Sequence, residues 1–159
     1  MEVWFLRHGE AVAREDWDGD DAHRPLSPRG TQRMERLSAA VASWGVIVDR
    51  VLYSPLVRAQ QTARIIARAF ATLGALEQDD RLAPGFGPQE LRAVLKEHRK
   101  AERLLLVGHE PDFSRVISSC VGGGRIEMKT GSLACVELDR REEPSGTLRW
   151  LVASAVLPS

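Results

Sequence analysis

The side chains in this sequence best suited to chemistry are two histidines and two arginines at or near the ends of short apolar runs: Arg7, His8, Arg58 and His109. Residues 3–6 and 104–107 are bulky apolar runs of strand length, and they end in Arg-His-Gly and Gly-His. Open α/β sheets bind ligands at the carboxyl ends of their parallel strands. We therefore expect the four side chains to meet at one edge of a sheet.

The combination of residue types decides which ligand this edge would hold. Two histidines alone would suit a metal ion, but two guanidiniums repel a cation, and no carboxylate is clearly placed to complete a metal shell. The forked donors of arginine suit a tetrahedral oxyanion. The set therefore predicts a site for phosphate-like anions without a metal, in which one imidazole attacks phosphorus and the other donates to its oxygens.

The structural alternative for each of these residues is a surface arginine on a helix or a hydrogen-bonded core histidine. For any single residue that alternative is the commoner one. It loses weight here because three predicted strand ends carry such a side chain.

Two predicted helices and a strand lie between the first apolar run and the middle of the chain. Met34, Leu37, Val41 and Trp44 recur at helical spacing and predict a helix over residues 30–44, and residues 50–53 read as a strand. Ser54 and Pro55 are suited to the N-cap and first position of a second helix, which would continue to Leu73. Arg58 then lies in its first turns, where the helix N-terminus already favours anions.

The remainder of the chain continues the alternation of helices and strands. A short strand is expected within residues 76–82, a Pro/Gly loop at 83–89, a helix from Pro88 to about Lys100, and a helix from Pro111 to about Ser119. Residues 133–138 and 148–156 read as an antiparallel hairpin. This order predicts a three-layer α/β/α fold with a mixed, mostly parallel central sheet, in one domain that spans residues 1–159.

The loop predicted over residues 11–29 is rich in aspartate, and that composition suggests a metal. An EF-hand loop needs glycine at its sixth position and glutamate at its twelfth. With Asp16 first, these positions hold Asp21 and Ser27, so the match fails and a solvated acidic loop is the better interpretation. His98 stands among charged residues and is expected to be exposed and unrelated to chemistry.

Composition narrows the partners and the compartment. The 159 residues include 22 basic and 22 acidic side chains, so the formal net charge is zero and no general attraction to nucleic acid or to an anionic membrane is expected. Cys120 and Cys135 follow no metal spacing and suggest a reducing compartment. No signal peptide or membrane-length apolar run is visible, and the prediction is a cytoplasmic protein.

Three motifs, in chain order, resemble the histidine phosphatase superfamily and its phosphoglycerate-mutase-like fold: Arg7-His8-Gly9, Ser54-Pro55-x-x-Arg58-Ala59-x-Gln61-Thr62 and Gly108-His109. The resemblance runs from Met1 to about Leu138. The small size and two further segments are similar to its SixA branch of phosphohistidine phosphatases: Arg7-His8-Gly9-Glu10-Ala11 and Pro25-Leu26-Ser27-x-x-Gly30.

The resemblance implies a role for each of the four residues. His8 would be the nucleophile that becomes phosphohistidine, Arg7 and Arg58 would bind the phosphoryl oxygens, and His109 would donate to the same oxygens. Water would then hydrolyse the phosphoenzyme, and no metal or organic cofactor is implied. The implied substrate is a protein that carries phosphohistidine.

The general acid is the part of this family pattern that the sequence does not supply. Larger members carry a Glu or Asp acid after the third strand, but residues 79–90 offer no convincing match. Asp79 and Asp80 are expected to cap or solvate the loop, while Glu10 and Glu90 are candidates without support. Phosphohistidine leaves as imidazole, which needs a proton less than an alkoxide does, so the absence favours the SixA-like interpretation. No large insertion could cover the site, which also suits a protein substrate.

Two alternatives stay open. The chain could be a phosphatase of small phosphoesters or phosphoanhydrides on the same fold, or a non-catalytic module that binds phosphorylated molecules. The presence of all four core residues argues against the second. Three further residues are left as either pocket neighbours or plain surface positions: Glu110, Lys129 and Ser132.

Overall fold

The structure is a computed structural model that describes residues 1–70, 76–140 and 142–156. Within this part of the chain one sheet has the strand order β3-β2-β4-β1-β5-β6. Its strands are β1 (Glu2–Arg7), β2 (Arg50–Tyr53), β3 (Leu76–Gln78), β4 (Arg103–Gly108), β5 (Leu133–Arg140) and β6 (Ser145–Val152). Strands β3, β2, β4 and β1 are parallel, whereas β5 is antiparallel to both β1 and β6.

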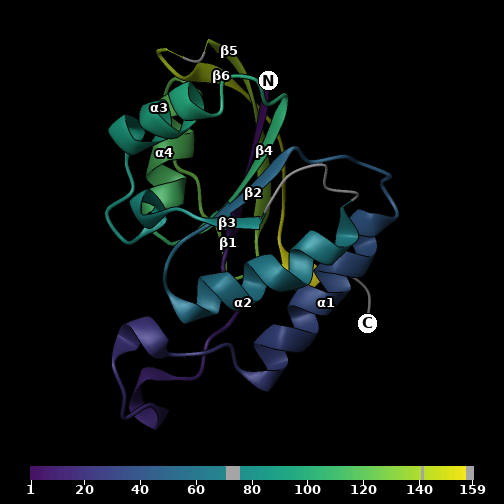
Figure 1. Ribbon diagram of the computed structural model, residues 1–159, viewed down its shortest axis with the longest axis vertical. Coiled ribbons are helices and arrows are strands. Elements are labelled where there is room, and N and C mark those ends of the chain that lie inside the picture. The colour runs from purple at the N-terminus through teal and green to yellow at the C-terminus, as the bar shows by residue number, and fades with distance from the viewer. Residues whose placement is uncertain (71–75, 141, 157–159) are drawn as a thin grey trace.

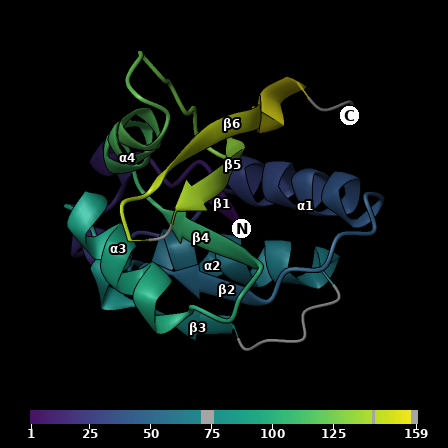
Figure 2. The same cartoon turned by 90° about the horizontal axis from the view of Figure 1, so that it is seen from above.

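Helices cover both faces of this sheet (Figures 1 and 2). Helices α1 (Pro28–Ala42) and α2 (Val57–Ile66) lie on one face, and α3 (Pro88–Glu97) and α4 (Asp112–Cys120) lie on the other. The predicted three-layer fold with a mixed, mostly parallel sheet is confirmed.

The side chains of β1 alternate between two cores. Val3 and Phe5 pack in the cluster that includes α3 and α4, whereas Trp4 and Leu6 pack in the cluster that includes α1 and α2. None of the four is more than 3% exposed. A strand buried on both faces has no polar face to present, which is why β1 reads as an unbroken apolar run.

The register of the parallel strands brings their carboxyl ends to one edge. Arg7 at the end of β1 lies opposite Gly108 at the end of β4, and Tyr53 at the end of β2 lies opposite Val107. The His8 N–H donates to the Gly108 carbonyl at 3.0 Å, so this pairing extends one residue beyond β1.

Two helix starts differ from the sequence prediction. Helix α1 begins at Pro28 rather than at residue 30, because the Ser27 hydroxyl caps it by accepting from the Gly30 N–H. Ser54 does not cap α2, which begins only at Val57.

The predicted ends of the helices also shift. Helix α1 ends at Ala42, so Trp44 lies beyond it and is 41% exposed, although its ring contacts Trp4 and Trp150. Helix α2 ends at Ile66 and continues as a 3₁₀ turn to Ala69, while the predicted end at Leu73 lies outside the described residues.

Three smaller differences concern the remaining elements. Helix α3 ends at Glu97 rather than near Lys100. Strand β6 lies at Ser145–Val152 instead of 148–156, since Ser154–Val156 is a 3₁₀ turn. The loop over residues 11–29 is more ordered than predicted, with 3₁₀ turns at Arg14–Asp16 and Asp21–His23 and a bridge between Ala11 and Leu26.

Two further features can be compared with the sequence predictions: the state of the cysteines and the length of the helices. Cys120 and Cys135 are free and buried, and burial raises the pKa of these thiols to about 11 and about 12. Across the described ranges, which omit 71–75, 141 and 157–159, no helix has the length and apolar character to cross a membrane.

Gly30 is the point at which α1 packs against the chain that leaves β1. A Cβ atom at this position would overlap the Glu10 carbonyl oxygen, which already accepts from the Ser27 N–H at 2.9 Å. For Gly30→Ala, overpacking strain of about 1–3 kcal/mol opposes a helix-propensity gain of about 1 kcal/mol. Because the obstacle is backbone, we expect a net loss of about 2 kcal/mol in the free energy of unfolding, measured with urea.

Gln32→Ala is the matched control, since Gln32 is an exposed residue of the same helix. Its free energy of unfolding should change by less than about 0.5 kcal/mol. A Gly30→Ala variant as stable as the parent protein would contradict the close packing of Gly30 on Glu10.

Candidate active site

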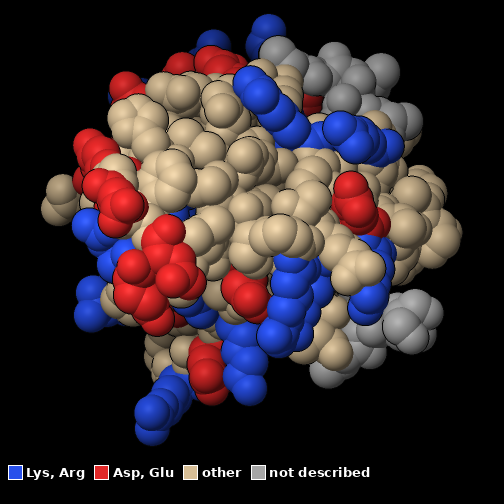
Figure 3. All heavy atoms as spheres, turned by 90° about the horizontal axis from the view of Figure 1, so that it is seen from below, with Lys and Arg blue, Asp and Glu red and all other residues tan. Residues whose placement is uncertain are grey.

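The four predicted side chains line one cavity at the carboxyl edge of the sheet. Its volume is about 330 Å³, and its lining includes Arg7, His8, Arg58 and His109. Figure 3 shows the molecule from below, the side on which the strands β1, β2 and β4 of Figure 1 end, and acidic and basic side chains are interspersed on this face. Because the net charge is zero, attraction of an anion must come from the cavity and not from the whole surface.

His8 follows β1 and is held in one tautomer. Its Nδ1 lies 2.7 Å from the Gly9 carbonyl oxygen, and because a carbonyl only accepts, Nδ1 carries the proton and donates it. Nε2 therefore keeps a lone pair. Burial, together with the positive charges of Arg58 and Arg7, lowers the pKa of His8 to about 4. At neutral pH the imidazole is uncharged and nucleophilic.

His109 follows β4 and lies beside His8, with 5.2 Å between the two ring centroids. The ring is 4% exposed, and its Nε2 lies 2.7 Å from the Ser54 hydroxyl oxygen. Ser54 lies two residues before Leu56, the N-cap of α2, and its hydroxyl contacts both the His109 imidazole and the Leu56 N–H. Burial, followed by the effect of His8, lowers the pKa of His109 to about 3.

The two predicted arginines are fixed by backbone and carboxylate oxygens. Arg7 donates from Nη1 to the Met128 carbonyl oxygen at 2.7 Å. Arg58 donates to Asp21 twice, to the carbonyl oxygen at 2.8 Å and to the carboxylate at 3.0 Å. In each guanidinium the Nε–H is buried and has no hydrogen-bond partner within the described residues. Unpaired cationic donors beside the cavity fit a site for an oxyanion.

Thr62 ties α2 to the residue that follows His8. Its hydroxyl accepts from the Gly9 N–H at 3.0 Å and donates to the Arg58 carbonyl oxygen at 2.7 Å. One side chain thus holds His8 and Arg58 in a fixed relation. Thr62 belongs to the motif over residues 54–62, but its position in that motif does not indicate this role.

The loop over residues 11–29 contributes to the site in a way that the sequence analysis missed. Arg24 lines the cavity and donates from Nε to the Asp21 carboxylate at 2.8 Å. The Asp21 side chain is 44% exposed, as a solvated loop predicts, but it also pairs with Arg24 and Arg58. Its pKa is lowered by the hydrogen bond from Arg24 and by the charges of Arg58 and Arg24. No local pattern signals this contact, because Asp21 and Arg58 are 37 residues apart.

The carboxylates left open by the sequence analysis fall into two groups. Glu10 lines the cavity but is paired with Arg33 at 3.0 Å, and Glu110 lines it while accepting from Ser114. Glu90 lies elsewhere and accepts from the Gly87 N–H at the start of α3.

The turn after residue 128 borders the cavity through Thr130. Lys129 is exposed and does not line the cavity. Ser132 is fully buried, and its carbonyl oxygen accepts from the Arg7 N–H at 3.0 Å.

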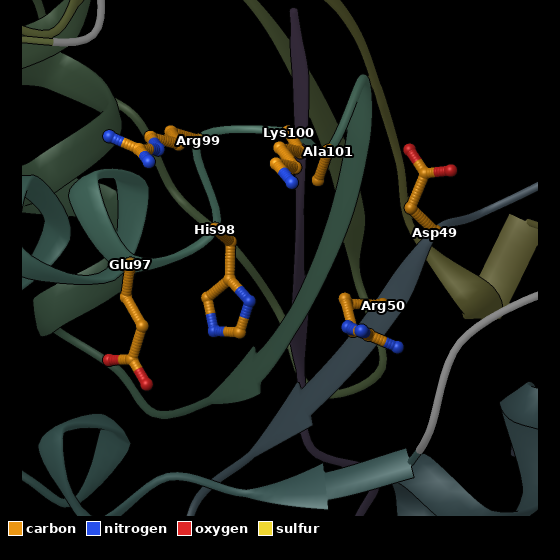
Figure 4. A pocket seen from close by; sticks show the side chains of 7 residues that line it. All are labelled: Asp49, Arg50, Glu97, His98, Arg99, Lys100 and Ala101. Carbon is orange, nitrogen blue, oxygen red and sulfur yellow. The ribbon is translucent and has the colours of Figure 1, made fainter.

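A second hollow, of about 460 Å³, lies at the opposite edge of the sheet, where β2 and β4 begin (Figure 4). Its lining includes His98, which is half-buried rather than exposed as predicted, and which lies away from His8 and His109. Asp49 there accepts from the backbone N–H groups of residues 102 and 103, and Glu97 pairs with Arg81 at 2.7 Å. The two arginines and two histidines predicted to act on a ligand thus line the smaller cavity.

Comparisons with known proteins agree with this geometry. A protein of Picosynechococcus sp. is 38% identical over 116 residues, which cover 71% of this chain and 68% of that protein. The phosphohistidine phosphatase SixA of Escherichia coli K12 is 27% identical over 155 residues, 94% of this chain and 92% of SixA. The solved structure of the protein histidine phosphatase SixA complexed with tungstate has a TM-score of 0.87 at 25% identity, covering 99% of this chain and 100% of SixA.

The family model supplies the assignment. It matches residues 3–115, the part of the chain that contains β1, the start of α2 and the β4–α4 turn, and with them all four cavity side chains. The chain belongs to branch 1 of the histidine phosphatase superfamily.

Proposed function

We propose that this protein is a phosphohistidine phosphatase that removes phosphate from phosphohistidine in proteins. The observation that carries the proposal is His8, whose proton is fixed on Nδ1 so that the neutral Nε2 is available among the cationic groups of the cavity. The relation to SixA supports the same substrate class.

The proposed first step is attack by His8 Nε2 on phosphorus. A bond forms between Nε2 and phosphorus as the bond from phosphorus to the substrate imidazole breaks, and the departing imidazole keeps the electron pair and takes a proton from solvent. Arg7 and Arg58 bind the phosphoryl oxygens throughout, because phosphoryl transfer depends mainly on positioning and on stabilisation of charge. Water then attacks the phosphoenzyme, releasing phosphate and restoring His8.

His109 is proposed to donate to the phosphoryl oxygens. The Ser54 hydroxyl oxygen accepts from the Leu56 N–H at 3.3 Å, and we assign its hydroxyl proton to His109 Nε2, 2.7 Å away. A neutral imidazole that accepts at Nε2 carries its proton on Nδ1. In this proposal the Nδ1–H is the donor to the phosphoryl oxygens, and Ser54 sets the tautomer.

The carboxylates of residues 79–90 support the choice of substrate. Asp79 pairs with Arg81, Asp80 accepts from Gln78, and Glu90 caps α3, so each has a partner of its own. This segment contributes Pro84 to the cavity lining and no carboxylate. A leaving group that needs a strong acid would find none here, whereas imidazole needs less help.

Two carboxylates elsewhere around the cavity already have arginine partners. Glu10 is paired with Arg33 and Arg29, and Asp21 is held by Arg24 and Arg58. Hydrogen bonds and positive charge keep the pKa of Asp21 below its ordinary value, so it holds no proton to donate at neutral pH.

Two features of the proposal rest on the sequence alone. Across the described ranges no group of three or more His, Cys, Asp or Glu side chains is arranged to hold a metal ion. Independence from metal stays a prediction, and so does the cytoplasmic location.

Substrate preference is the first test. We expect a phosphohistidine peptide to be hydrolysed with a kcat/KM at least about a hundredfold above that of a panel of phosphoesters, because one general acid typically contributes a factor of about 100–10,000. The assay contains EDTA, and release of inorganic phosphate is measured. Equal or faster turnover of phosphoesters would move the function to a small-molecule phosphatase, and turnover of nothing would indicate a binding module.

The nucleophile is tested by His8→Ala. We expect kcat to fall by about a thousandfold or more, and the acid-labile phosphate that labels the enzyme in a rapid quench to disappear. His98→Ala is the control, because His98 lies at the opposite edge of the sheet (Figure 4) and its loss should leave both readouts unchanged. Full activity in His8→Ala would exclude the proposed mechanism.

The lowered pKa values of His8 and His109 predict how stability depends on pH. Imidazoles in the unfolded chain titrate near about 6.5, so the unfolded state binds more protons between that pH and the folded values. The free energy of unfolding should therefore be largest above about pH 6.5 and fall as the pH is lowered toward 4. Urea unfolding at several pH values measures this.

His109→Asn removes one of the two titrating groups and should give a shallower dependence. In parallel, nitrogen-15 NMR of the parent protein should show His8 neutral and protonated on Nδ1 at pH 6.5. A charged His8 at that pH would contradict both the tautomer and its role as nucleophile.

A further inference from the structure

A groove lies next to the catalytic cavity and shares a wall with it. Its volume is about 570 Å³, and Glu110 lines both the groove and the cavity. We call it the α4 groove, and the residues used here to define it are Glu110, Ser114, Arg115, Arg125, Ile126 and Glu127. It is thus bounded by the first turns of α4 and by the segment that follows the Gly122-Gly123-Gly124 turn.

The walls of the α4 groove are fastened to the rest of the molecule. The Ser118 hydroxyl of α4 donates to the Gly124 carbonyl oxygen at 2.6 Å, and the Gly123 N–H donates to the Ser118 carbonyl oxygen at 2.8 Å. At the other end of the segment, the Met128 carbonyl oxygen holds Arg7 of the catalytic cavity. These hydrogen bonds fix the position of the groove relative to Arg7, the arginine proposed to bind phosphate.

The charged side chains of the α4 groove differ in whether they have a hydrogen-bond or ion-pair partner. Glu110 accepts two hydrogen bonds from Ser114, and the negative charges of Glu110 and Glu127 both act on Arg7, opposing the effect of burial on its pKa. Arg115 and Arg125 are exposed, and within residues 1–70, 76–140 and 142–156 neither guanidinium has a hydrogen bond or an ion pair. Within the same residues Glu127 is exposed and likewise has no hydrogen bond or ion pair, so the free charges of the groove are two positive and one negative.

We propose that the α4 groove binds the polypeptide segment that flanks the phosphohistidine of the substrate protein, and that Arg115 and Arg125 select segments with acidic residues. A phosphohistidine side chain in the cavity brings its own backbone to the rim, and Glu110 joins that rim to the groove. Exposed guanidiniums favour carboxylates on the partner and repel basic segments, so they set specificity more than overall affinity. This inference rests on the proposed function and extends it.

The test compares three phosphohistidine peptides whose flanking residues are acidic, neutral or basic. Each is assayed with the parent protein, with the double variant Arg115→Ala/Arg125→Ala, and with the charge-reversed variant Arg115→Glu/Arg125→Glu. The control is Arg50→Ala/Lys100→Ala, which removes the same charge from the hollow at the opposite edge of the sheet (Figure 4). Hydrolysis of phosphoramidate, which carries a P–N bond but no peptide, reports the chemistry alone.

For the parent protein we expect kcat/KM to be highest for the acidic peptide. Two exposed ion pairs correspond to a change of about fivefold, so the alanine double variant should lose about that factor on the acidic peptide at low salt. Its rate on phosphoramidate should not change. The charge-reversed variant should prefer the basic peptide, and the control should behave as the parent protein.

The possible failures can be told apart. If the parent protein hydrolyses all three peptides equally, or the variants keep the parent's order of preference, the α4 groove does not select the substrate and this inference is overturned. If the parent protein hydrolyses neither the peptides nor phosphoramidate, the proposed function itself fails. Loss of phosphoramidate hydrolysis in the alanine variant would assign the arginines to the catalytic centre and also overturn selection by the groove.

Discussion

The parallel pairing of β1 with β4 is the constraint on which the site depends. It sets Arg7 opposite Gly108, so His8 and His109, separated by 100 residues of chain, emerge side by side at the same edge. Burial of a large apolar side chain is worth about 1.5–3 kcal/mol, and β1 buries four in succession on two faces. A slip of one residue would exchange the two cores and separate the imidazoles, so packing of the sheet fixes the geometry of the chemistry.

The second requirement is to keep cationic and neutral groups together without letting the histidines become charged. Burial and the neighbouring guanidiniums lower the pKa of both imidazoles, and Gly9 and Ser54 each hold one ring nitrogen. The positive charge of Arg58 is balanced by Asp21 from a distant loop. This arrangement fits the roles proposed here, anion binding by the arginines and nucleophilic attack by an uncharged histidine.

The surroundings of the cavity fit a reaction in which substrate recognition matters more than proton donation to the leaving group. The carboxylates that line the cavity are paired with arginine or accept from serine, and the α4 groove adjoins the cavity at Glu110. If the substrate is phosphohistidine, as proposed, its imidazole leaves readily, and selectivity must come mainly from contacts outside the reacting atoms.

Features that depend on neighbours along the chain could be predicted from the residues alone. Apolar runs predicted β1 and β4, helical periodicity predicted α1, and the residues that end the runs predicted His8 and His109. Contacts between segments far apart in the chain could not be predicted in this way. Asp21 binds Arg58, the Ser54 hydroxyl contacts His109, and Arg24 enters the cavity. The reason is physical: local spacing fixes secondary structure and strand ends, whereas the partner of a polar side chain is set by the packing of the sheet and helices.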